Sequence, residues 1–575
     1  MKDERIINRA ILLLLLCSFL LRAFVAGFIE LGNDEVYYWT YAKFPDWSHF
    51  DHPPMVGWVI QLFTLNLRFD NEFFLRLGAV VFGTLNTGLI YLIGRKIKDP
   101  LTGLYAALLF TASIYCFIIA GIFIMPDTPQ VLFWLLSIWL LLDCLPDKEL
   151  SKRSRTRLLL AGVTIGLALL SKYHSAFLVA GVFLYMLLFN RKWFRAKETY
   201  FAFLIALALF TPVIIWNYEN SFVSFTFHEN RVGYSGTHIR WDYFGTELAG
   251  QFFYSNPVNF IIILFSLFAI IRRKQFIDSP AMRILLIISL PLAIVFMGFS
   301  LYRSTLPHWT GPAYLGLILV AAAWLSGGTG KSTSPKLFPW PLKIAVFFQL
   351  LLITAGVLQI HYGMIPLTRH GIDDVTVQLQ GWNQLGEKFK TVNERDVIKG
   401  KISATAPILS FRWFPAANLD YYVARPLHKK VYTLGTLSLI HKYYWIDKVY
   451  GDLQKGTDAY YIALSNNYRD PHERYGLLFD SIVPADTLKI YRGRELTWQA
   501  YIFRLYGLKK QISFRKLNDF LDPTNEQIEY WVQKIESHPE WLRDVKEKAR
   551  KKDATLNDVL WDEASWMAEQ QKQNL

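Results

Sequence analysis

Carboxylates, imidazoles and cationic side chains gather in five short segments that lie between long apolar runs. The segments read "GNDEVYYWTYA" at 32–42, "FDHPPM" at 50–55, "IMPDTPQ" at 124–130, "SKYHS" at 171–175 and "LYRSTLPHWTGPAY" at 301–314. A carboxylate can remove the proton of an attacking hydroxyl or amine. Lys, Arg and His side chains can hold a phosphate leaving group. Together these residue types predict transfer of a group from a phosphate carrier that sits in the bilayer.

The candidate site residues divide into two groups. Asp34, Glu35 and Asp127 are the candidate catalytic carboxylates. The double proline after residue 52 fixes two backbone φ angles and removes two hydrogen-bond donors, so it should hold the side chains before it in place. The candidate substrate-binding residues share the same loops and are Asp51, His52, Lys172, Arg303, His308, Tyr37 and Tyr38.

Several of these residues also fit a purely structural role. Asp127 begins an Asp-x-x-Gln pattern, which can cap a helix. Lys172 and Arg303 could extend to lipid headgroups, and the rings of Tyr37 and Tyr38 could anchor a helix at the membrane interface. Asp34 or Asp51 could be a solvated loop acid, and Glu35 could orient the start of a helix. His52 could form a structural hydrogen bond beside the prolines, and His308 could belong to the aromatic residues of the membrane interface.

A metal ion is an open possibility. Asp34, Asp51, Asp127 and His52 offer oxygen and nitrogen ligands that a divalent ion could use, yet their spacing matches no established ligand pattern. No other cofactor is expected.

The elements that must position these residues are membrane helices. The chain has 575 residues, of which 53% are hydrophobic and 16% aromatic, values that are unusual for a soluble protein of this length. Several apolar runs are long enough to cross about 30 Å of hydrocarbon as helices. We therefore predict an α-helical polytopic membrane protein with about eleven spans, near 8–28, 75–94, 101–120, 128–145, 158–170, 174–190, 199–217, 256–271, 283–301, 310–326 and 342–361.

Charge in the connecting loops predicts their sides. The loops that follow the even-numbered spans are basic, among them "GRKIKDP", "DKELSKRSRTR" and "NRKWFRAK", which is the pattern of cytoplasmic loops. The basic residues that keep these loops in the cytoplasm explain much of the net charge of +14, so a nucleic-acid partner is not expected. The candidate residues then lie together on the extracytoplasmic face of the cytoplasmic (inner) membrane, and an odd number of spans places 362–575 there too.

The sequence predicts three parts. Residues 1–361 form the membrane domain. Residues 362–510 contain short β-rich runs such as "KKVYTLG" and predict an extracytoplasmic mixed α/β domain. Residues 511–575 are predicted to be a charged helical tail.

The motifs resemble a known class. The span pattern with "NDEVYYWTYA", "FDHPP", "MPDTP" and "PHW" is similar to the polytopic glycosyltransferases of the GT-C fold, and most of all to glycosyltransferase family 39. That family includes the protein O-mannosyltransferases and the bacterial lipid A aminoarabinose transferases. The resemblance covers roughly residues 1–360. It implies a polyprenyl-phosphate sugar donor and inversion at the anomeric carbon.

The resemblance also implies roles for particular residues. Asp34 matches the catalytic carboxylate of the first outer loop, Glu35 its motif partner and Asp127 the acid of the second outer loop. Asp51 and His52 occupy an acid-Lys-Pro-Pro motif in which His52 replaces the lysine, so Lys172 or Arg303 could supply the phosphate contact instead. The short 218–255 loop lacks room for the large insert of the eukaryotic mannosyltransferases, which favours a bacterial relative that acts on an envelope acceptor.

Two other classes of function are weighed beside this one. A transporter or flippase of lipid-linked sugars would be favoured by ionisable residues deep in the spans, and these are scarce in the sequence. A non-catalytic scaffold would not need acids in several outer loops. The sugar, the acceptor (glycolipid, polysaccharide or protein) and the oligomeric state are left open.

Overall fold

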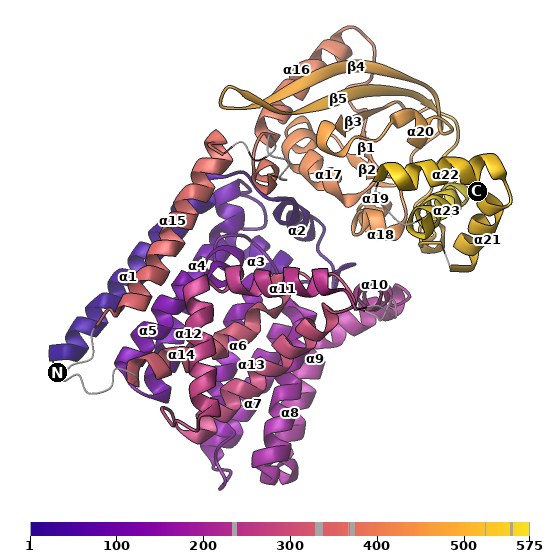
Figure 1. Cartoon of the computed structure of the whole chain (residues 1–575). Coiled ribbons are helices and arrows are strands. Elements are labelled where there is room, and N and C mark those ends of the chain that lie inside the picture. Colours follow the sequence, from indigo (N-terminus) through magenta and orange to yellow (C-terminus); the bar gives the residue numbers. More distant parts are fainter. Residues whose placement is uncertain are drawn as a thin grey trace. The chain divides into compact units, whose positions relative to one another are not determined.

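The chain forms two compact units, Met1–Gln380 and Gly381–Leu575. The computed structural model describes residues 2–232, 239–327, 337–365, 367, 374–523, 525–552 and 556–573. The first unit is helical and the second contains a sheet (Figure 1). This matches the predicted helical membrane protein with a C-terminal α/β domain.

The first unit consists of helices joined by short loops, with a π-helical turn at Tyr115–Ile119 and single 3-10 turns at Tyr173–Ser175 and Pro307–Thr310. Its α-helices are α1 (Lys2–Phe28), α2 (Asn33–Lys43), α3 (Met55–Phe63), α4 (Glu72–Ile97), α5 (Pro100–Ala112), α6 (Asp127–Cys144), α7 (Lys152–Ser171), α8 (Ala176–Phe189), α9 (Lys197–Glu219), α10 (Val223–Val232), α11 (Trp241–Tyr254), α12 (Pro257–Ile271), α13 (Ser279–Phe299), α14 (Gly311–Gly327) and α15 (Trp340–Tyr362).

Each predicted span overlaps one of these helices, but the span predicted at 101–120 is not one helix, because α5 ends at Ala112 and a π-helical turn follows. Within the described part of the chain, seven helical segments are long and apolar enough to cross a membrane, and α11 with α12 forms a further candidate that is bent by 100°. The segments Pro100–Ala112 and Tyr173–Phe189 are apolar but shorter. Their lengths alone do not decide whether they cross fully, so eleven spans stay a prediction.

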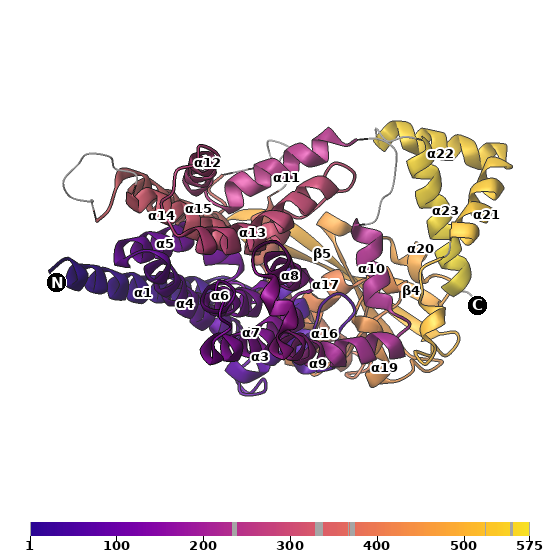
Figure 2. The ribbon, with the colours of Figure 1, turned by 90° about the horizontal axis from the view of Figure 1, so that it is seen from below.

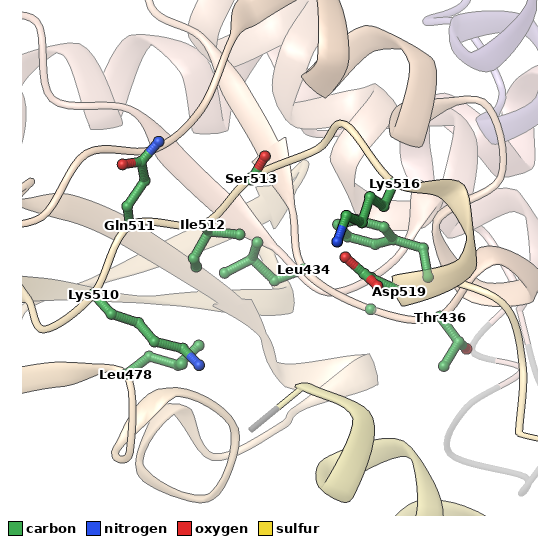
Figure 3. Close-up of a pocket in the computed structure, with 11 residues that line it drawn as sticks. Leu434, Thr436, Leu478, Lys510, Gln511, Ile512, Ser513, Lys516 and Asp519 are labelled. Atoms are coloured by element: carbon green, nitrogen blue, oxygen red, sulfur yellow. The ribbon is translucent and has the colours of Figure 1, made fainter. Parts of the chain in front are cut away.

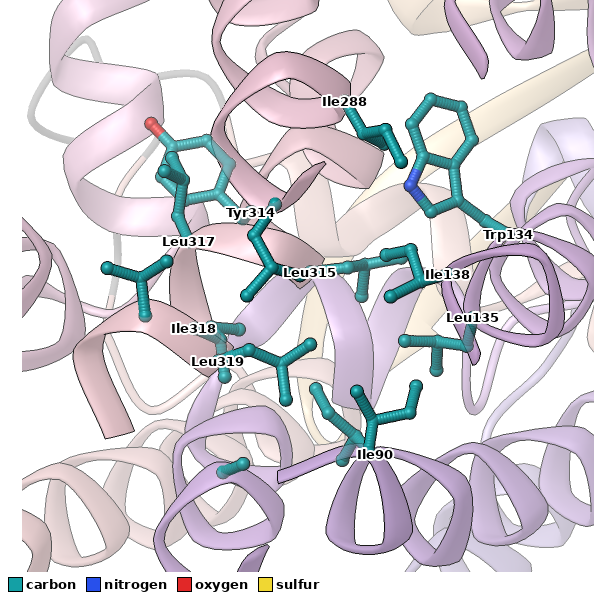
Figure 4. Close-up of a cluster of buried hydrophobic side chains, with 14 of the residues drawn as sticks. Ile90, Trp134, Leu135, Ile138, Ile288, Tyr314, Leu315, Leu317, Ile318 and Leu319 are labelled. Carbon is teal, nitrogen blue, oxygen red and sulfur yellow. The ribbon is translucent and has the colours of Figure 1, made fainter. Parts of the chain in front are cut away.

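The membrane unit packs around α14. In the span that contains α14, 78% of the apolar window is buried, more than in the other six candidate spans of the described residues. Leu315, Ile318 and Leu319 of this helix belong to the same buried cluster as Trp134 of α6 and Ile288 of α13 (Figure 4). Such close packing makes the helices a rigid frame for the loops at their ends.

Small residues let neighbouring helices approach closely. A Cβ on Gly94 of α4 would lie 2.8 Å from the Cα of Gly103 of α5, so neither position has room for a side chain. Helices α1 and α4 run beside one another in both ribbon views (Figures 1 and 2). This packing brings the carboxyl end of α1 to the amino end of α4, which is where the chemistry of the site begins.

The second unit is built on a five-stranded mixed sheet with the order β2-β1-β3-β5-β4. The short strands β1 (Ile408–Ser410), β2 (Val431–Thr433) and β3 (Ala459–Leu464) are parallel and fully buried. The long hairpin of β4 (Phe479–Arg492) and β5 (Glu495–Leu508) adds antiparallel strands. The helices of this part are α16 (Trp382–Ile398), α17 (Trp413–Asn418), α18 (Leu437–Ile440), α19 (Tyr443–Tyr450) and α20 (Pro471–Tyr475).

The chain ends in three helices, α21 (Asn525–Glu536), α22 (Pro539–Lys552) and α23 (Leu556–Gln573). Their apolar faces pack into a small core of their own that includes Trp531, Ile535 and Leu560. This agrees with the helical character expected of the tail.

Candidate active site

Asp34 lies in the first turn of α2, directly after the loop that follows α1. Its side chain is exposed, and within the described residues its carboxylate accepts no hydrogen bond. Protein surrounds it on several sides, and this desolvation, followed by the nearby charges of Asp51 and Glu35, raises the pKa of Asp34 to about 6. A carboxylate with a pKa near neutral pH and no bonding partner is suited to accept a proton.

Glu35 has a different environment from its neighbour. It is buried, and Arg76 of α4 donates to both of its oxygens, at 2.7 Å from Nε and 2.5 Å from Nη2. The backbone N–H groups of Gly32 and Ile124 also donate to it, at 2.9 and 3.1 Å. Arg76 in turn donates to three backbone carbonyls near the end of α1, those of Ala26, Ile29 and Glu30.

This Glu35–Arg76 clamp joins four pieces of chain. It holds the amino end of α2 to α1, to α4 and to the loop before α6, and because Asp34 precedes Glu35 it fixes the backbone of Asp34 as well. Each carboxylate oxygen of Glu35 accepts one hydrogen bond from Arg76 and one from a backbone N–H group.

Asp51 is held by phenols. The hydroxyls of Tyr37 and Tyr41 donate to its Oδ1 at 2.8 and 2.5 Å. The rings of Tyr37, Tyr38 and Tyr41 are buried, at 2%, 4% and 1% exposure. The predicted alternative that the aromatic residues of α2 anchor it at the headgroup level is therefore wrong, because these rings are packed inside the protein.

His52 lies against the same rings. Its imidazole packs on Tyr38, with ring centroids 5.8 Å apart, and its Nδ1 is buried without a hydrogen-bond partner in the described residues. Burial lowers the pKa of His52 to about 3, so the ring is neutral at physiological pH. A neutral ring cannot supply the charge of the lysine that it replaces in the motif.

Asp127 and Lys172 form a buried ion pair. Lys172 Nζ lies 2.8 Å from Asp127 Oδ2, and the hydroxyl of Tyr115 donates to Oδ1 at 2.8 Å. Both charged side chains are almost completely buried. The alternatives of a capping Asp127 and a lipid-facing Lys172 are both wrong, because no side chain caps α6 and the amine points to the carboxylate.

The segments that carry these residues converge electrostatically. The charges of Lys172 and Arg231 act on Asp34, and the charge of Lys172 also acts on Asp127, to which His308 is electrostatically coupled. The candidate residues 34, 51, 52, 127, 172 and 308 thus form one cluster. Arg303 follows α13, and its backbone N–H donates to the carbonyl of Phe299 at 2.9 Å.

Two residues of α10 complete the cluster. His228 Nε2 lies 2.7 Å from the backbone carbonyl of Asp51, and Arg231 packs on the Phe227 and Trp309 rings at 5.4 and 5.0 Å. Arg231 is exposed and forms no ion pair within the described residues. Arg231 was not among the residues predicted from the sequence; the signal available was its position as one of two arginines in the predicted outer loop 218–255.

The arrangement does not gather the ligands of a metal ion. Within the described residues, no group of three or more His, Cys, Asp or Glu side chains is placed to hold one. Asp51 is engaged by tyrosines and Asp127 by Lys172, so the four ligands that the sequence offered are not free to converge. Metal dependence therefore enters no step of the mechanism below.

The chain is similar to known membrane proteins in sequence and in fold. Residues 51–216 match the family described as dolichyl-phosphate-mannose-protein mannosyltransferase. Over 302 residues the chain is 24% identical to the lipid A galacturonosyltransferase RgtD of Rhizobium johnstonii, an alignment that covers 51% of this chain and 60% of that relative. The chain thus matches less than two thirds of the relative's length.

The fold is similar to that of a solved structure. ArnT from Cupriavidus metallidurans in the apo state superimposes with a TM-score of 0.56 at 14% identity, over 86% of this chain and 98% of that chain. The same protein bound to undecaprenyl phosphate gives a TM-score of 0.54 at 14% identity, over 86% and 97% of the two chains. As its motifs predicted, the chain is a polytopic membrane protein with the GT-C glycosyltransferase fold.

Proposed function

We propose that the protein is a membrane glycosyltransferase that moves a sugar from a polyprenyl-phosphate donor to an acceptor of the cell envelope. The observation that carries this proposal is Asp34, an accessible carboxylate without a hydrogen-bond partner in the described residues, beside the cations Lys172 and Arg231. The galacturonosyltransferase RgtD supports the class of reaction, and the undecaprenyl phosphate bound to ArnT supports the class of donor.

The reaction needs a base and a cationic site for the leaving group. Asp34 takes the proton of the acceptor hydroxyl or amine while the acceptor oxygen or nitrogen bonds to the anomeric carbon. The bond from that carbon to the phosphate oxygen breaks on the opposite face, so the anomeric configuration inverts. The phosphate keeps the electron pair, and Asp34 releases its proton to solvent.

Arg231 is the side chain best suited to the departing phosphate. Its guanidinium is exposed, has no counter-ion within the described residues and acts on Asp34 electrostatically. Lys172 adds positive potential but is already paired with Asp127. A free guanidinium can bind two phosphate oxygens at once.

The remaining candidates take supporting roles in this proposal. Glu35 positions α2 through Arg76, rather than touching substrate. Asp51 is a fixed anion that keeps the pKa of Asp34 high. Tyr38, His52 and His308 line the route of the sugar and offer neutral hydrogen-bonding groups, whereas Tyr37 orients Asp51. Arg303, which follows α13, contacts either the lipid-linked donor or the lipid headgroups.

The site faces the extracytoplasmic side in this proposal. The basic loops after the even-numbered spans support that orientation, since such loops are retained in the cytoplasm. The acceptor could be a glycolipid, a polysaccharide or a protein of the envelope, and the sugar a hexose or a pentose.

The donor class is tested by reconstitution. We expect the purified protein in liposomes to transfer labelled sugar from polyprenyl-phosphate donors to envelope extracts, and to leave UDP- and GDP-sugars untouched. The reason is that the cationic site is matched to a lipid-anchored phosphate beside the spans. Efficient transfer from a nucleotide sugar without a polyprenyl carrier would refute the proposal.

The pH dependence follows from Asp34. Its pKa is raised to about 6, and the base must be ionised, so kcat/KM should be constant at high pH and fall about tenfold per pH unit below pH 6. Replacing Asp51 by Asn removes one of the charges that raise this pKa, so the acidic limb should move to lower pH. A pH–rate profile of the wild-type and Asp51→Asn enzymes measures both effects. An acidic limb that does not move in the variant would contradict this assignment.

One observation favours the alternative, a transporter or flippase of lipid-linked sugars. Arg22 of α1 is completely buried, and none of its guanidinium nitrogens has a hydrogen-bond partner in the described residues. Intramembrane charges often mark substrate paths. However, Arg22 is sealed between Phe117 and the glycines at 83 and 121. A path needs access, so the transferase remains the better proposal.

A further inference from the structure

A second candidate binding site lies within the C-terminal unit. It is a pocket of about 390 Å³ between the turn that follows β2 and the segment that follows β5. This volume is in the range of small-molecule sites. Nothing in the transfer reaction uses it.

The pocket offers two unpaired amines. Lys510 and Lys516 line it and form no ion pair within the described residues. Figure 3 shows their side chains on opposite sides of the pocket, with Asp519 beside Lys516. Two separated cations, with an acid beside one of them, fit a ligand that carries both negative charge and hydrogen-bond donors.

The rest of the lining is uncharged, with apolar and hydroxyl-bearing side chains beside the amide of Gln511. Phe520 lines the pocket and is 8% exposed, and its ring packs against those of Phe514 and Tyr444, at centroid distances of 5.6 and 5.1 Å. Leu434 adds apolar surface, and Thr436 adds a hydroxyl. A pyranose ring has the matching character, since its C–H face is apolar and its rim bears hydroxyls.

We propose that this pocket binds an acidic saccharide, that is, a sugar that carries a carboxylate or a phosphate. The two lysines bind the acidic groups, Asp519 and Thr436 accept or donate to sugar hydroxyls, and Leu434 with Phe520 contacts the ring. A purely anionic ligand would not use the apolar wall, and a neutral sugar would leave both amines unpaired. The site goes beyond the proposed transfer and does not depend on it.

Binding to the full-length protein in nanodiscs tests the site. The probes are trigalacturonate, glucose 6-phosphate, maltotriose and inorganic phosphate, measured by titration calorimetry. We expect at least one acidic sugar to bind, and the neutral sugar and inorganic phosphate to bind at least about tenfold more weakly. The stronger of trigalacturonate and glucose 6-phosphate identifies the acidic group as carboxylate or phosphate.

Variants place the binding in the pocket. Lys510→Met and Lys516→Met should each weaken acidic-sugar binding by about tenfold or more, since a hydrogen bond to a charged group typically contributes 1.5–3 kcal/mol. Lys399→Met is the matched control, because Lys399 is an exposed lysine of the same unit outside the pocket. The inactive Asp34→Asn variant should keep the binding, which separates this site from the transfer site.

Two results would overturn the inference. One is acidic-sugar binding that survives both lysine variants. The other is inorganic phosphate that binds as tightly as the acidic sugars, which would reduce the pocket to an unspecific anion site.

Discussion

The Asp34→Asn variant is expected to lose transfer activity by about 10²–10⁴-fold or more, the usual cost of removing a general base. Asparagine has nearly the same size but cannot take the proton of the acceptor. The loss should appear in kcat, while donor affinity should change much less, because the phosphate is bound by cations and not by Asp34. Turnover of labelled polyprenyl-phosphate sugar at saturating donor measures the effect.

Folding should survive this substitution. The pKa of Asp34 is raised in the folded protein, which means that its ionised form is disfavoured there; above pH 6 the neutral asparagine should therefore be at least as stable, and this gain should disappear below about pH 4, where the carboxyl is protonated in both states. The matched control is Asp242→Asn, which removes an exposed acid that pairs with Arg240 at the start of α11. Normal turnover by Asp34→Asn would remove the basis of the transferase proposal and favour the transporter.

The Glu35→Gln variant is expected to fail in a different way, by destabilising the membrane unit. It leaves the Arg76 guanidinium buried without its counter-charge, and breaking a buried ion pair in this way typically costs about 3–5 kcal/mol. We expect a clearly lower melting temperature in detergent and lower yield, with less loss of turnover per folded molecule than for Asp34→Asn. Thermal unfolding together with active-site-normalised kinetics distinguishes the two effects.

The control for Glu35→Gln is an exposed pair. Arg95 and Glu4 form an ion pair whose side chains are 46% and 47% exposed, so Glu4→Gln should change stability by no more than about 1 kcal/mol. Removing both charges of the clamp, with Glu35→Met and Arg76→Met together, should destabilise less than the sum of the single changes. A Glu35→Gln protein that melts like the wild type would show that the clamp does not hold α2.

Much of the architecture could be predicted from the sequence because membrane spans are long apolar runs that are easily recognised. Long apolar runs have one physical explanation, and each predicted span overlaps a helix. The β-rich runs around residues 408 and 431 likewise became buried strands. The division of the bent α11–α12 segment was not predictable, since the 100° break depends on packing and not on composition.

The site was predictable in part. Acids at the ends of apolar runs pointed to Asp34 and Asp127, and the structure brings both into one cluster with Lys172. Which acid is engaged was not predictable, because Glu35 finds Arg76 at a distance of 41 positions along the chain. The burial of the tyrosines of α2 was missed for a similar reason: aromatic residues beside a span look the same in sequence whether they face lipid or protein.

The Glu35–Arg76 clamp has a mechanical consequence. It holds the side of the site that carries Asp34 in place, since α1, α4 and the loop before α6 would all have to move for Asp34 to shift. The opposite side, α10, is attached differently, without a buried ion pair among the described residues. Ser224 and His228 hydrogen-bond to the backbone carbonyls of His49 and Asp51, and the Phe227 and His228 rings pack on Phe50 and Tyr173. We therefore expect a closing motion around a substrate to move α10 rather than the clamped base, so that the distance from base to leaving group is set from the phosphate side.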